Sequence, residues 1–456
     1  MKENLPSYLA EAKPNPAENR LAWFKNIAPS YAGIILWFVF WQNTVNIGAG
    51  AGGLAYGILT PILGVVLGAV LCYLLYYKTP ALLGLKSGMP LYVVGSSVFG
   101  AKGGIAMPGL LMGLLQFGWV GVNIFFSSIL LHETLTFIPL WAIMVVWGAL
   151  ATFMGLVGIK YVAKISTYLP LIPLVILIIL VAKTISTVSS FDPAVLQPSL
   201  DAAKAAGAPI SKLGIISAIT VVMIGFFATA GAAGADFATG ARNKSDVRWG
   251  GLVGITFFMI LTAVAAIVIV AGAYGDKETA AKLVSEGKST LNATAVMPFV
   301  LGSSAGKICM FLLALAAFPA ACFSAMIAAN SFKTMLPKIN ANASVAVGGI
   351  AAIILAVTGV AEHADKVFNF FGASFAPICG ALTADYILAG GKWSGARAGF
   401  NPAGWIAWAV GFAIGVLPMF GYLTELPFNP VISFFAGAII YALCMKAGVK
   451  TKLLDE

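Results

Sequence analysis

Twelve apolar stretches, each about 20 residues or longer, recur along this sequence and leave few folds open to it. That length lets a helix cross the hydrocarbon core of a bilayer. Only 10% of the 456 residues are charged and 60% are hydrophobic, whereas a soluble domain carries about 25% charged residues. We therefore predict an all-α integral membrane protein with twelve transmembrane helices. The predicted spans are 28–56, 57–83, 103–132, 139–159, 166–184, 211–238, 248–274, 293–329, 342–361, 366–391, 401–421 and 428–447.

The basic residues predict how the helices are oriented. Most of the 27 Lys and Arg fall on the side of the amino terminus, and basic loops stay on the cytoplasmic side of a membrane. We expect a multi-pass protein of the cell membrane with both termini in the cytoplasm. This topology explains the net charge of +10; no clustered basic face for nucleic acid is evident. The expected partners are the lipid bilayer and a small-molecule substrate, with no obligate protein partner.

A polar stripe in the third predicted span is the clearest signal of function. Gln116, Trp119, Asn123 and Ser127 are spaced by three, four and four residues, so their side chains share one helix face. An unpaired amide in hydrocarbon is costly, so this face is expected to contact protein or a water-filled cavity that marks a substrate path. For Gln116 and Trp119 we favour contact with a flat ligand over core packing, whereas Asn123 and Ser127 are expected to bridge helices.

The first and sixth predicted spans contain features that interrupt helices. The first holds a polar cluster at 42–46 followed by four glycines within 48–53, and each glycine weakens a helix by about 1 kcal/mol. The sixth holds three glycines and Asp236 within 225–236. Close helix packing through small residues is the alternative explanation. We expect unwinding in the first span and leave both explanations open for the sixth.

Interrupted spans at matching places in two halves indicate an inverted-repeat transporter. Spans one and six are five apart, which predicts a five-plus-five inverted repeat followed by two extra helices. The predicted organisation is a cytoplasmic tail at 1–27, a first repeat at 28–184, an outer loop at 185–210, a second repeat at 211–391, and two further helices with the cytoplasmic carboxyl terminus at 392–456.

Motifs of enzymes and of metal or cofactor sites are missing from the sequence. There is no HExxH, Walker A or CxxC pair, and the two histidines, His132 and His363, fall at outer ends of spans. GAGAGG at 48–53 resembles a dinucleotide loop, but such a loop belongs to a βαβ unit and this one lies in an apolar span. We therefore expect no enzyme, no metal and no cofactor. The five scattered cysteines predict no disulfide.

Two aspartates lie close to the membrane interior. Asp236 and Asp385 sit near the cytoplasmic ends of their spans, and each is followed by a basic residue, Arg242 and Lys392. We favour ion pairing at the interface over proton transfer for both, and the proton-transfer alternative stays open.

Three segments resemble cytosine permeases, which are bacterial members of the nucleobase:cation symporter family. QFGWVGV at 116–122 is similar to their third-span motif, GFFATAGAAGADFATGARNK at 225–244 to their sixth-span segment, and FGASFAPICGALTADYILAG at 371–390 to their tenth. The resemblance extends loosely over residues 30–445. It implies the leucine-transporter-like fold, in which broken first and sixth helices flank the substrate.

The resemblance also implies roles for single residues. It places a base between Trp119 and Phe227, with the neighbouring Phe226 as a further contact and Gln116 hydrogen-bonded to the base. Stacking contributes on the order of 1 kcal/mol per aromatic pair beyond burial. An amide donates and accepts at once, which matches the amide-like edge of a pyrimidine.

Departures from the family pattern concern the substrate and the coupling ion. The amides Gln42 and Asn43 in the first span suggest altered substrate recognition. Family members bind sodium with first-span carbonyls and eighth-span hydroxyls, but residues 319–320 here are Pro and Ala. The nearest hydroxyl is Ser324, and Asn46 is the first-span candidate for the cation. The resemblance favours sodium over a proton, and both stay open.

The sequence therefore predicts a secondary active importer of a nucleobase or similar planar heterocycle, with cytosine as the expected substrate. It would carry a cation with the substrate and work by alternating access. A carrier of amino acids or amines on the same fold is the alternative within transport, but no mid-membrane charge is evident to bind such a solute. From a different class, a channel or a non-transporting receptor remains open.

Overall fold

The computed structural model describes residues 5–40, 52–157, 168–205, 207, 210–285, 293–423 and 426–454. Ten helices in these ranges are long and apolar enough to cross a membrane. Two shorter apolar helices, Ile27–Leu36 and Asn342–Val357, lie where the first and ninth spans are predicted. The chain is thus an all-helical, multi-pass membrane protein, and the count of twelve spans stays a prediction.

The long helices follow the predicted spans, because each is an apolar run bounded by polar residues, Gly or Pro. Six of the membrane-crossing helices combine more than one element: Leu59–Ser87, Ile105–His132, Leu171–Ser190, Lys212–Ala238, Lys244–Gly275 and Pro402–Phe420. The main elements are α4 (Leu59–Leu71), α5 (Lys78–Ser87), α8 (Leu111–His132), α9 (Leu140–Val157), α11 (Leu171–Thr184), α13 (Lys212–Ala232), α16 (Phe258–Gly275), α19 (Ser303–Met335), α20 (Ala341–Val357), α21 (Ala364–Leu388), α22 (Pro402–Val416) and α23 (Asn429–Lys446). Shorter helices used below are α1 (Ser7–Ala10), α2 (Ile27–Ser30), the 3₁₀ helix η2 (Ala32–Phe40), α6 (Leu91–Val94), α12 (Gln197–Ala205), α14 (Gly234–Ala238), α15 (Lys244–Gly251) and α18 (Ala293–Leu301).

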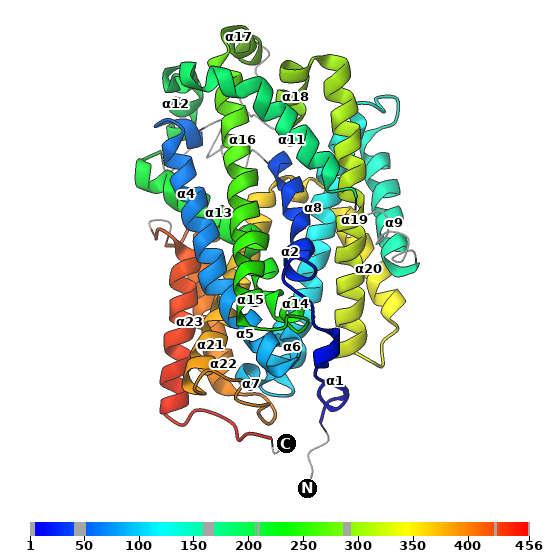
Figure 1. The fold of residues 1–456 in the computed structure, drawn as a ribbon, viewed down its shortest axis with the longest axis vertical. Helices are drawn as coiled ribbons and strands as arrows, with labels where there is room; N and C mark the ends of the chain where they lie inside the picture. Colours follow the sequence, from blue (N-terminus) through cyan, green and yellow to red (C-terminus); the bar gives the residue numbers. More distant parts are fainter. Residues whose placement is uncertain are drawn as a thin grey trace.

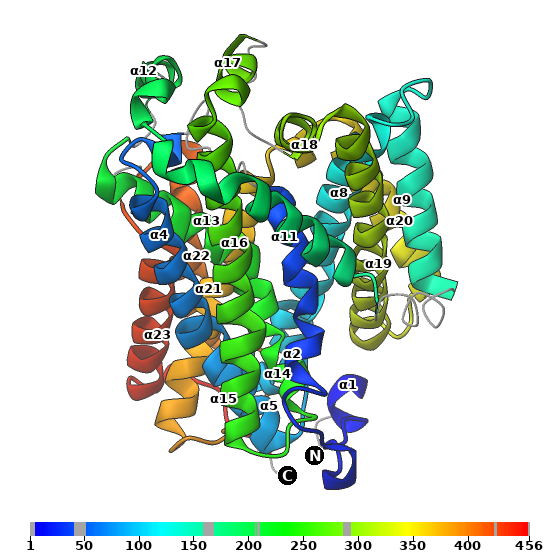
Figure 2. The ribbon, with the colours of Figure 1, turned by 45° about the horizontal axis from the view of Figure 1, so that its top comes forward.

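Two groups of helices lie side by side (Figure 2). In one group α8, α9, α19 and α20 all contact one another, and in the other α13 packs against α4 and α21, which in turn packs against α22 and α23. Between them, η2 contacts α16 and α19. Both termini lie at one end of the molecule, here called the termini end (Figure 1). The division leaves the interface between the groups as the place for a site.

The sixth predicted span is interrupted, but only briefly. α13 ends at Ala232, Ala233 forms a turn, and α14 begins at Gly234. Close packing also accounts for a glycine in this span, because a Cβ on Gly225 would lie 2.6 Å from the carbonyl oxygen of Phe368 in α21. The glycines of the sixth span are therefore explained both by an interruption of the helix and by close helix packing. In the first span the described part includes a 3₁₀ helix, and the polar cluster at 42–46 lies outside the described residues.

The eighth predicted span is wrong at its start. Residues 293–329 were predicted as one span, but the structure divides the segment into α18 and α19 at Gly302, whose φ is +83°. Its ψ is 157°, so the backbone leaves the helical conformation there, and glycine adopts this positive φ without the strain that a side chain would cause. The apolar character of α18 misled the prediction, since hydropathy does not detect a turn. α19 itself continues through Pro319 to Met335.

Candidate functional site

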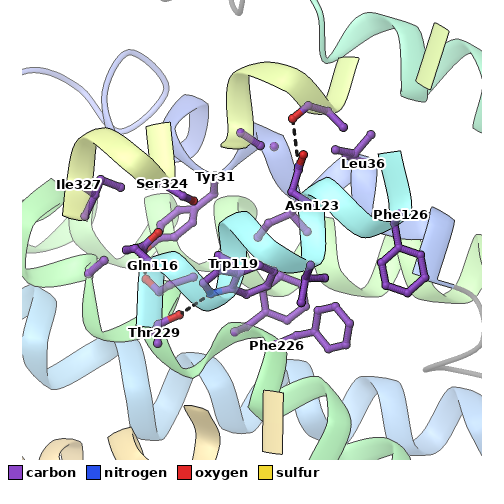
Figure 3. Close-up of a pocket in the computed structure, with 18 of the residues that line it drawn as sticks. Tyr31, Leu36, Gln116, Trp119, Asn123, Phe126, Phe226, Thr229, Ser324 and Ile327 are labelled. Carbon is purple, nitrogen blue, oxygen red and sulfur yellow. Dashed lines mark hydrogen bonds between the residues drawn. The ribbon is translucent and has the colours of Figure 1, made fainter. Parts of the chain in front are cut away.

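A central cavity of about 240 Å³ lies between the two helix groups. Its walls come from η2 and the end of α2, and from α8, α13 and α19. Figure 3 shows Gln116, Trp119 and Asn123 in sequence along α8, with Thr229 and Phe226 approaching from α13. The wall thus joins segments that are far apart in the sequence.

Most of the predicted site residues line this central cavity. The structure brings together Gln116, Trp119, Phe226, Phe227 and Ser324. The remaining polar-stripe residues, Asn123 and Ser127, also lie along it. The first-span candidates Gln42, Asn43 and Asn46 lie outside the described residues.

Trp119 is held in place by contacts from two other helices. Its indole Nε1–H donates to the hydroxyl oxygen of Thr229 in α13, at 3.4 Å. Its ring lies 6.1 Å from that of Phe226 in an edge-to-face arrangement and 4.4 Å from that of Phe368 in α21. The indole is half-buried and lines the cavity. These contacts orient the indole at the cavity wall.

Stacking of a base between Trp119 and Phe227 stays a prediction, and the two rings belong to one aromatic cluster. Phe226 makes the edge-to-face contact with Trp119, while Phe227 packs 6.0 Å from Phe226 and also lines the cavity. The Phe368 ring lies 3.7 Å from the Phe226 ring, between α13 and α21. Sequence reasoning missed Phe368. The phenylalanine-rich segment at 368–375 was an available signal, but its spacing does not say which ring meets α8.

Gln116 retains polar atoms for a ligand. It is 9% exposed, and the contact found for its side chain among the described residues runs from Nε2 to the sulfur of Met112, at 3.8 Å. A thioether is a weak acceptor. The carboxamide can therefore donate and accept hydrogen bonds toward the cavity without giving up a strong partner.

Asn123 bridges helices, as expected from the sequence. Its Nδ2 donates to the carbonyl oxygen of Ala317 in α19, at 3.0 Å (Figure 3). Its Oδ1 accepts a hydrogen bond from the Ser127 hydroxyl at 3.3 Å, which stays within α8. Asn123 thus joins α8 to α19, while Ser127 supports the amide from one turn away.

The described lining of the central cavity carries no charged side chain. Its polar groups are hydroxyls, amides and one indole. The Tyr31 hydroxyl is already used, since it donates to the Ala230 carbonyl at 2.8 Å. From α19 the cavity receives a single hydroxyl, that of Ser324, and four apolar side chains, those of Leu313, Ala317, Ala320 and Ile327. This surface suits a neutral ligand that is apolar on its faces and polar at its edge.

A second, wide cavity of about 710 Å³ lies beside the first. The two share Gln116, Ala233, Phe237 and Ile327 as wall residues. The other walls of the wide cavity include α1 and the last turn of α19, which lie toward the termini end (Figure 1). Gln116 therefore stands where a solute would pass between the central cavity and the termini end.

The amino-terminal segment covers part of the wide cavity. Tyr8, which lines this cavity, is buried and donates its hydroxyl to the carbonyl oxygen of Ala101 at 2.6 Å. Burial raises the pKa of this phenol, so it stays protonated and acts as a donor. The segment predicted as a tail is thus attached to the helix bundle at this point.

The predicted ion pairs of the two membrane aspartates are wrong. Arg242 pairs with Asp246 at 2.8 Å, because a helical spacing of four residues brings them together. Asp385 accepts hydrogen bonds from the hydroxyls of Tyr441 (2.8 Å) and Ser394 (2.7 Å) instead. Asp236 accepts one from a backbone N–H and takes part in neither ion pair of the described chain.

No protein-family model and no curated protein matches this chain. Solved transporter structures share its fold. The inward-facing conformation of Mhp1 is similar with a TM-score of 0.67 at 15% identity, covering 99% of this chain and 96% of Mhp1. A second structure shows Mhp1, a nucleobase-cation-symport-1 family transporter, in a closed conformation with bromovinylhydantoin bound. Its TM-score is 0.63 at 16% identity, and the match covers 98% of this chain and 95% of Mhp1. A Na⁺-coupled sialic acid symporter has a TM-score of 0.56 at 12% identity, and the match covers 99% of this chain and 96% of the symporter.

These likenesses show the fold. The chain has the leucine-transporter-like architecture, a five-plus-five inverted repeat with additional helices, that the positions of its interrupted spans predict. Its structural neighbours include a transporter of the nucleobase:cation symporter family, which its sequence motifs resemble.

Proposed function

We propose that this protein imports a neutral planar nucleobase, with cytosine as the expected substrate, together with a cation, sodium or a proton. One observation carries the proposal: Gln116 and Trp119, one helical turn apart, line an uncharged stretch of cavity wall next to Phe226. Aromatic rings cover the faces of a base, and the carboxamide matches its hydrogen-bonding edge. Hydrogen bonds of this kind also reject analogues that lack the matching groups.

The structural neighbours support this substrate class. Mhp1 belongs to the nucleobase-cation-symport-1 family and binds bromovinylhydantoin, a compound built on a flat ring with amide-like edges. The present cavity offers the same kind of chemistry. An amino acid or amine would leave its charged groups unpaired against the described cavity wall, which disfavours that alternative.

Alternating access accounts for the two cavities. We infer that the substrate rests in the central cavity and leaves past Gln116 through the wide cavity. Because basic residues concentrate on the side of the termini, the wide cavity would open to the cytoplasm of an inner-membrane protein. Rocking of one helix group against the other would then open and close each side in turn.

Transport into proteoliposomes with imposed ion gradients tests the proposal. Purified protein should accumulate labelled cytosine against its concentration gradient, and unlabelled cytosine should compete. Cytosine should also raise the melting temperature of the detergent-solubilised protein, because a ligand bound only by the folded form stabilises it by RT ln(1 + [L]/Kd). Binding without accumulation would identify a receptor, and flux that never exceeds equilibrium would identify a channel. Absence of binding by every nucleobase would refute the proposal.

A further inference from the structure

Asp236 lies where the sixth helix is interrupted and lines the wide cavity. It belongs to α14, three residues after the turn at Ala233. Its Oδ1 accepts a hydrogen bond from the backbone N–H of Leu91 in α6, at 3.3 Å. The carboxyl group therefore connects α14 to α6 in the wall of a cavity that leads toward the termini end.

No cation neutralises this carboxylate within the described part of the chain, since neither ion pair there includes Asp236. Glu11 and Lys333 also line the wide cavity, and both side chains are exposed. The phenols of Tyr31 and Tyr92 interact electrostatically with Asp236. These phenols stay neutral near pH 7. Asp236 thus has no cationic partner among the described residues.

The helix that packs most directly on α14 does not supply a counter-ion either. α5 contacts α14, and it carries Lys78 and Lys86. Lys86 donates to the Tyr386 hydroxyl at 2.9 Å, and Lys78 is exposed. No lysine of α5 lies within ion-pair distance of Asp236 in the structure described.

Asp236 is linked to the central cavity through neighbouring residues, one in the turn before α14 and one in α14 itself. Ala233 and Phe237, three residues before it and one after it, line both cavities. The Phe237 ring packs edge-to-face against Tyr31 at 5.2 Å, and Tyr31 belongs to the first span and lines the central cavity. A change in the environment of Asp236 therefore acts on a wall of the substrate site.

We propose that Asp236 is the proton-binding site that couples substrate import to a proton gradient. This inference rests on the proposed function as an importer. The helix of the eighth predicted span, α19, is consistent with it. This helix presents only one hydroxyl, that of Ser324, to the central cavity, whereas the family resemblance implies eighth-span hydroxyls for a sodium site. The cation carried with the substrate is then a proton held by a carboxyl group.

Desolvation supplies the coupling. A carboxylate without a nearby cation is stable while the wide cavity is filled with water, but closing that cavity around the charge is costly. Closure therefore favours the neutral carboxyl, and opening to water favours release of the proton. In each import cycle one proton from the outer side reaches one carboxylate oxygen of Asp236 through the central cavity while the wide cavity is closed. It leaves the same oxygen for cytoplasmic water when the wide cavity opens, with no other bond formed or broken.

Gradient-driven uptake and exchange in proteoliposomes test the inference. The wild type should accumulate cytosine when an inward proton gradient is imposed at equal sodium on both sides. Asp236→Asn should fall to the level reached without a gradient, while it still exchanges internal for external cytosine. Glu11→Gln, a carboxyl change in the same cavity, should accumulate cytosine like the wild type. Accumulation by Asp236→Asn in response to the proton gradient would overturn the inference, as would a wild type that responds to sodium alone.

Binding by the wild-type protein provides a second readout if Asp236→Asn fails to fold. Cytosine added in weakly buffered solution should cause proton uptake, and its affinity should rise as the pH falls, by up to about tenfold per pH unit where one site titrates. Asp236→Glu should keep this coupling and shift its midpoint. Affinity independent of pH, with no proton uptake, would contradict the inference.

Infrared spectroscopy separates failure of the inference from failure of the proposed function, because it needs no substrate. Because the chain has 17 Asp and Glu, the titration spectra of wild type and Asp236→Asn are subtracted. The difference should show one carboxylic-acid C=O band that converts to a carboxylate band and is absent from Asp236→Asn. A spectrum that is unchanged by the substitution would overturn the proton site, even if cytosine transport is confirmed. Titration of Asp236 without any nucleobase binding would instead refute the proposed substrate.

Discussion

The indole N–H of Trp119 donates to the hydroxyl of Thr229 over 3.4 Å, and this hydrogen bond joins α8 to α13 at the wall of the central cavity. The two residues belong to opposite helix groups, whose relative motion would open and close the site. The contact therefore connects the position of the proposed stacking surface to the arrangement of the helices.

Thr229→Val tests this connection. Valine preserves the shape of the side chain but removes the acceptor, so the indole is less firmly positioned. Loss of one neutral hydrogen bond is worth about 0.5–1.5 kcal/mol, and cytosine affinity should fall by about 2- to 10-fold. Thr220→Val is the control, because Thr220 donates to the Gly64 carbonyl, away from the cavity lining. Equal affinities for the two variants in a binding assay would show that the contact does not position Trp119.

Gln116→Leu removes the hydrogen-bonding side chain while preserving its approximate size. A bound base would lose a partner at its polar edge, which costs about 1–3 kcal/mol, so cytosine affinity should fall by roughly 5- to 100-fold. Isothermal titration calorimetry measures the change. Gln197→Leu, in the exposed helix α12, should bind cytosine like the wild type. Unchanged affinity for Gln116→Leu would place the base elsewhere.

Asn123→Leu should affect stability more than binding. The substitution removes the hydrogen bond from Nδ2 to the Ala317 carbonyl, and such bonds between membrane helices contribute about 0.6 kcal/mol on average. The melting temperature of the purified protein should fall, and it should fall less for Ser127→Ala, which removes the supporting bond within α8. A loss of affinity as large as that of Gln116→Leu at an unchanged melting temperature would instead indicate direct substrate contact.

Phe368→Leu should broaden the range of substrates. The Phe368 ring lies 4.4 Å from the Trp119 ring and 3.7 Å from the Phe226 ring, so a smaller side chain opens space behind the proposed stacking surface. Adenine and hypoxanthine should compete better with labelled cytosine than they do in the wild type. Phe370→Leu, which changes a more exposed ring that packs against Phe412 in α22, should leave the competition unchanged. Identical competition profiles for all three proteins would exclude Phe368 as a determinant of size.

The central part of the site could be predicted from the sequence because helical spacing is a local property. The spacings within Gln116, Trp119, Asn123 and Ser127 are sufficient to predict a shared helix face, and the cost of burying amides predicts that this face meets a cavity. The structure places that face along the central cavity. The interrupted first and sixth spans likewise predict the repeat architecture from composition and position alone.

Contacts between distant segments could not be predicted in this way. The contact of Phe368 with Trp119 depends on how α21 packs against α13, where Gly225 lets the two backbones approach. The division at Gly302 was missed because a single glycine with a positive φ leaves the hydropathy of the segment unchanged. The surroundings of Asp236 depend on Leu91, which is 145 residues away in the sequence.

The central claim is that Trp119 forms the surface on which a planar base is bound. Equilibrium binding of labelled cytosine to purified wild type, Trp119→Ala and Trp141→Ala tests it most directly. Trp141 is 61% exposed on α9 and is a matched tryptophan control. The account predicts saturable binding by the wild type and by Trp141→Ala, and loss of binding by Trp119→Ala with a folded protein by size-exclusion chromatography. Unimpaired binding by Trp119→Ala would contradict the assignment of the site.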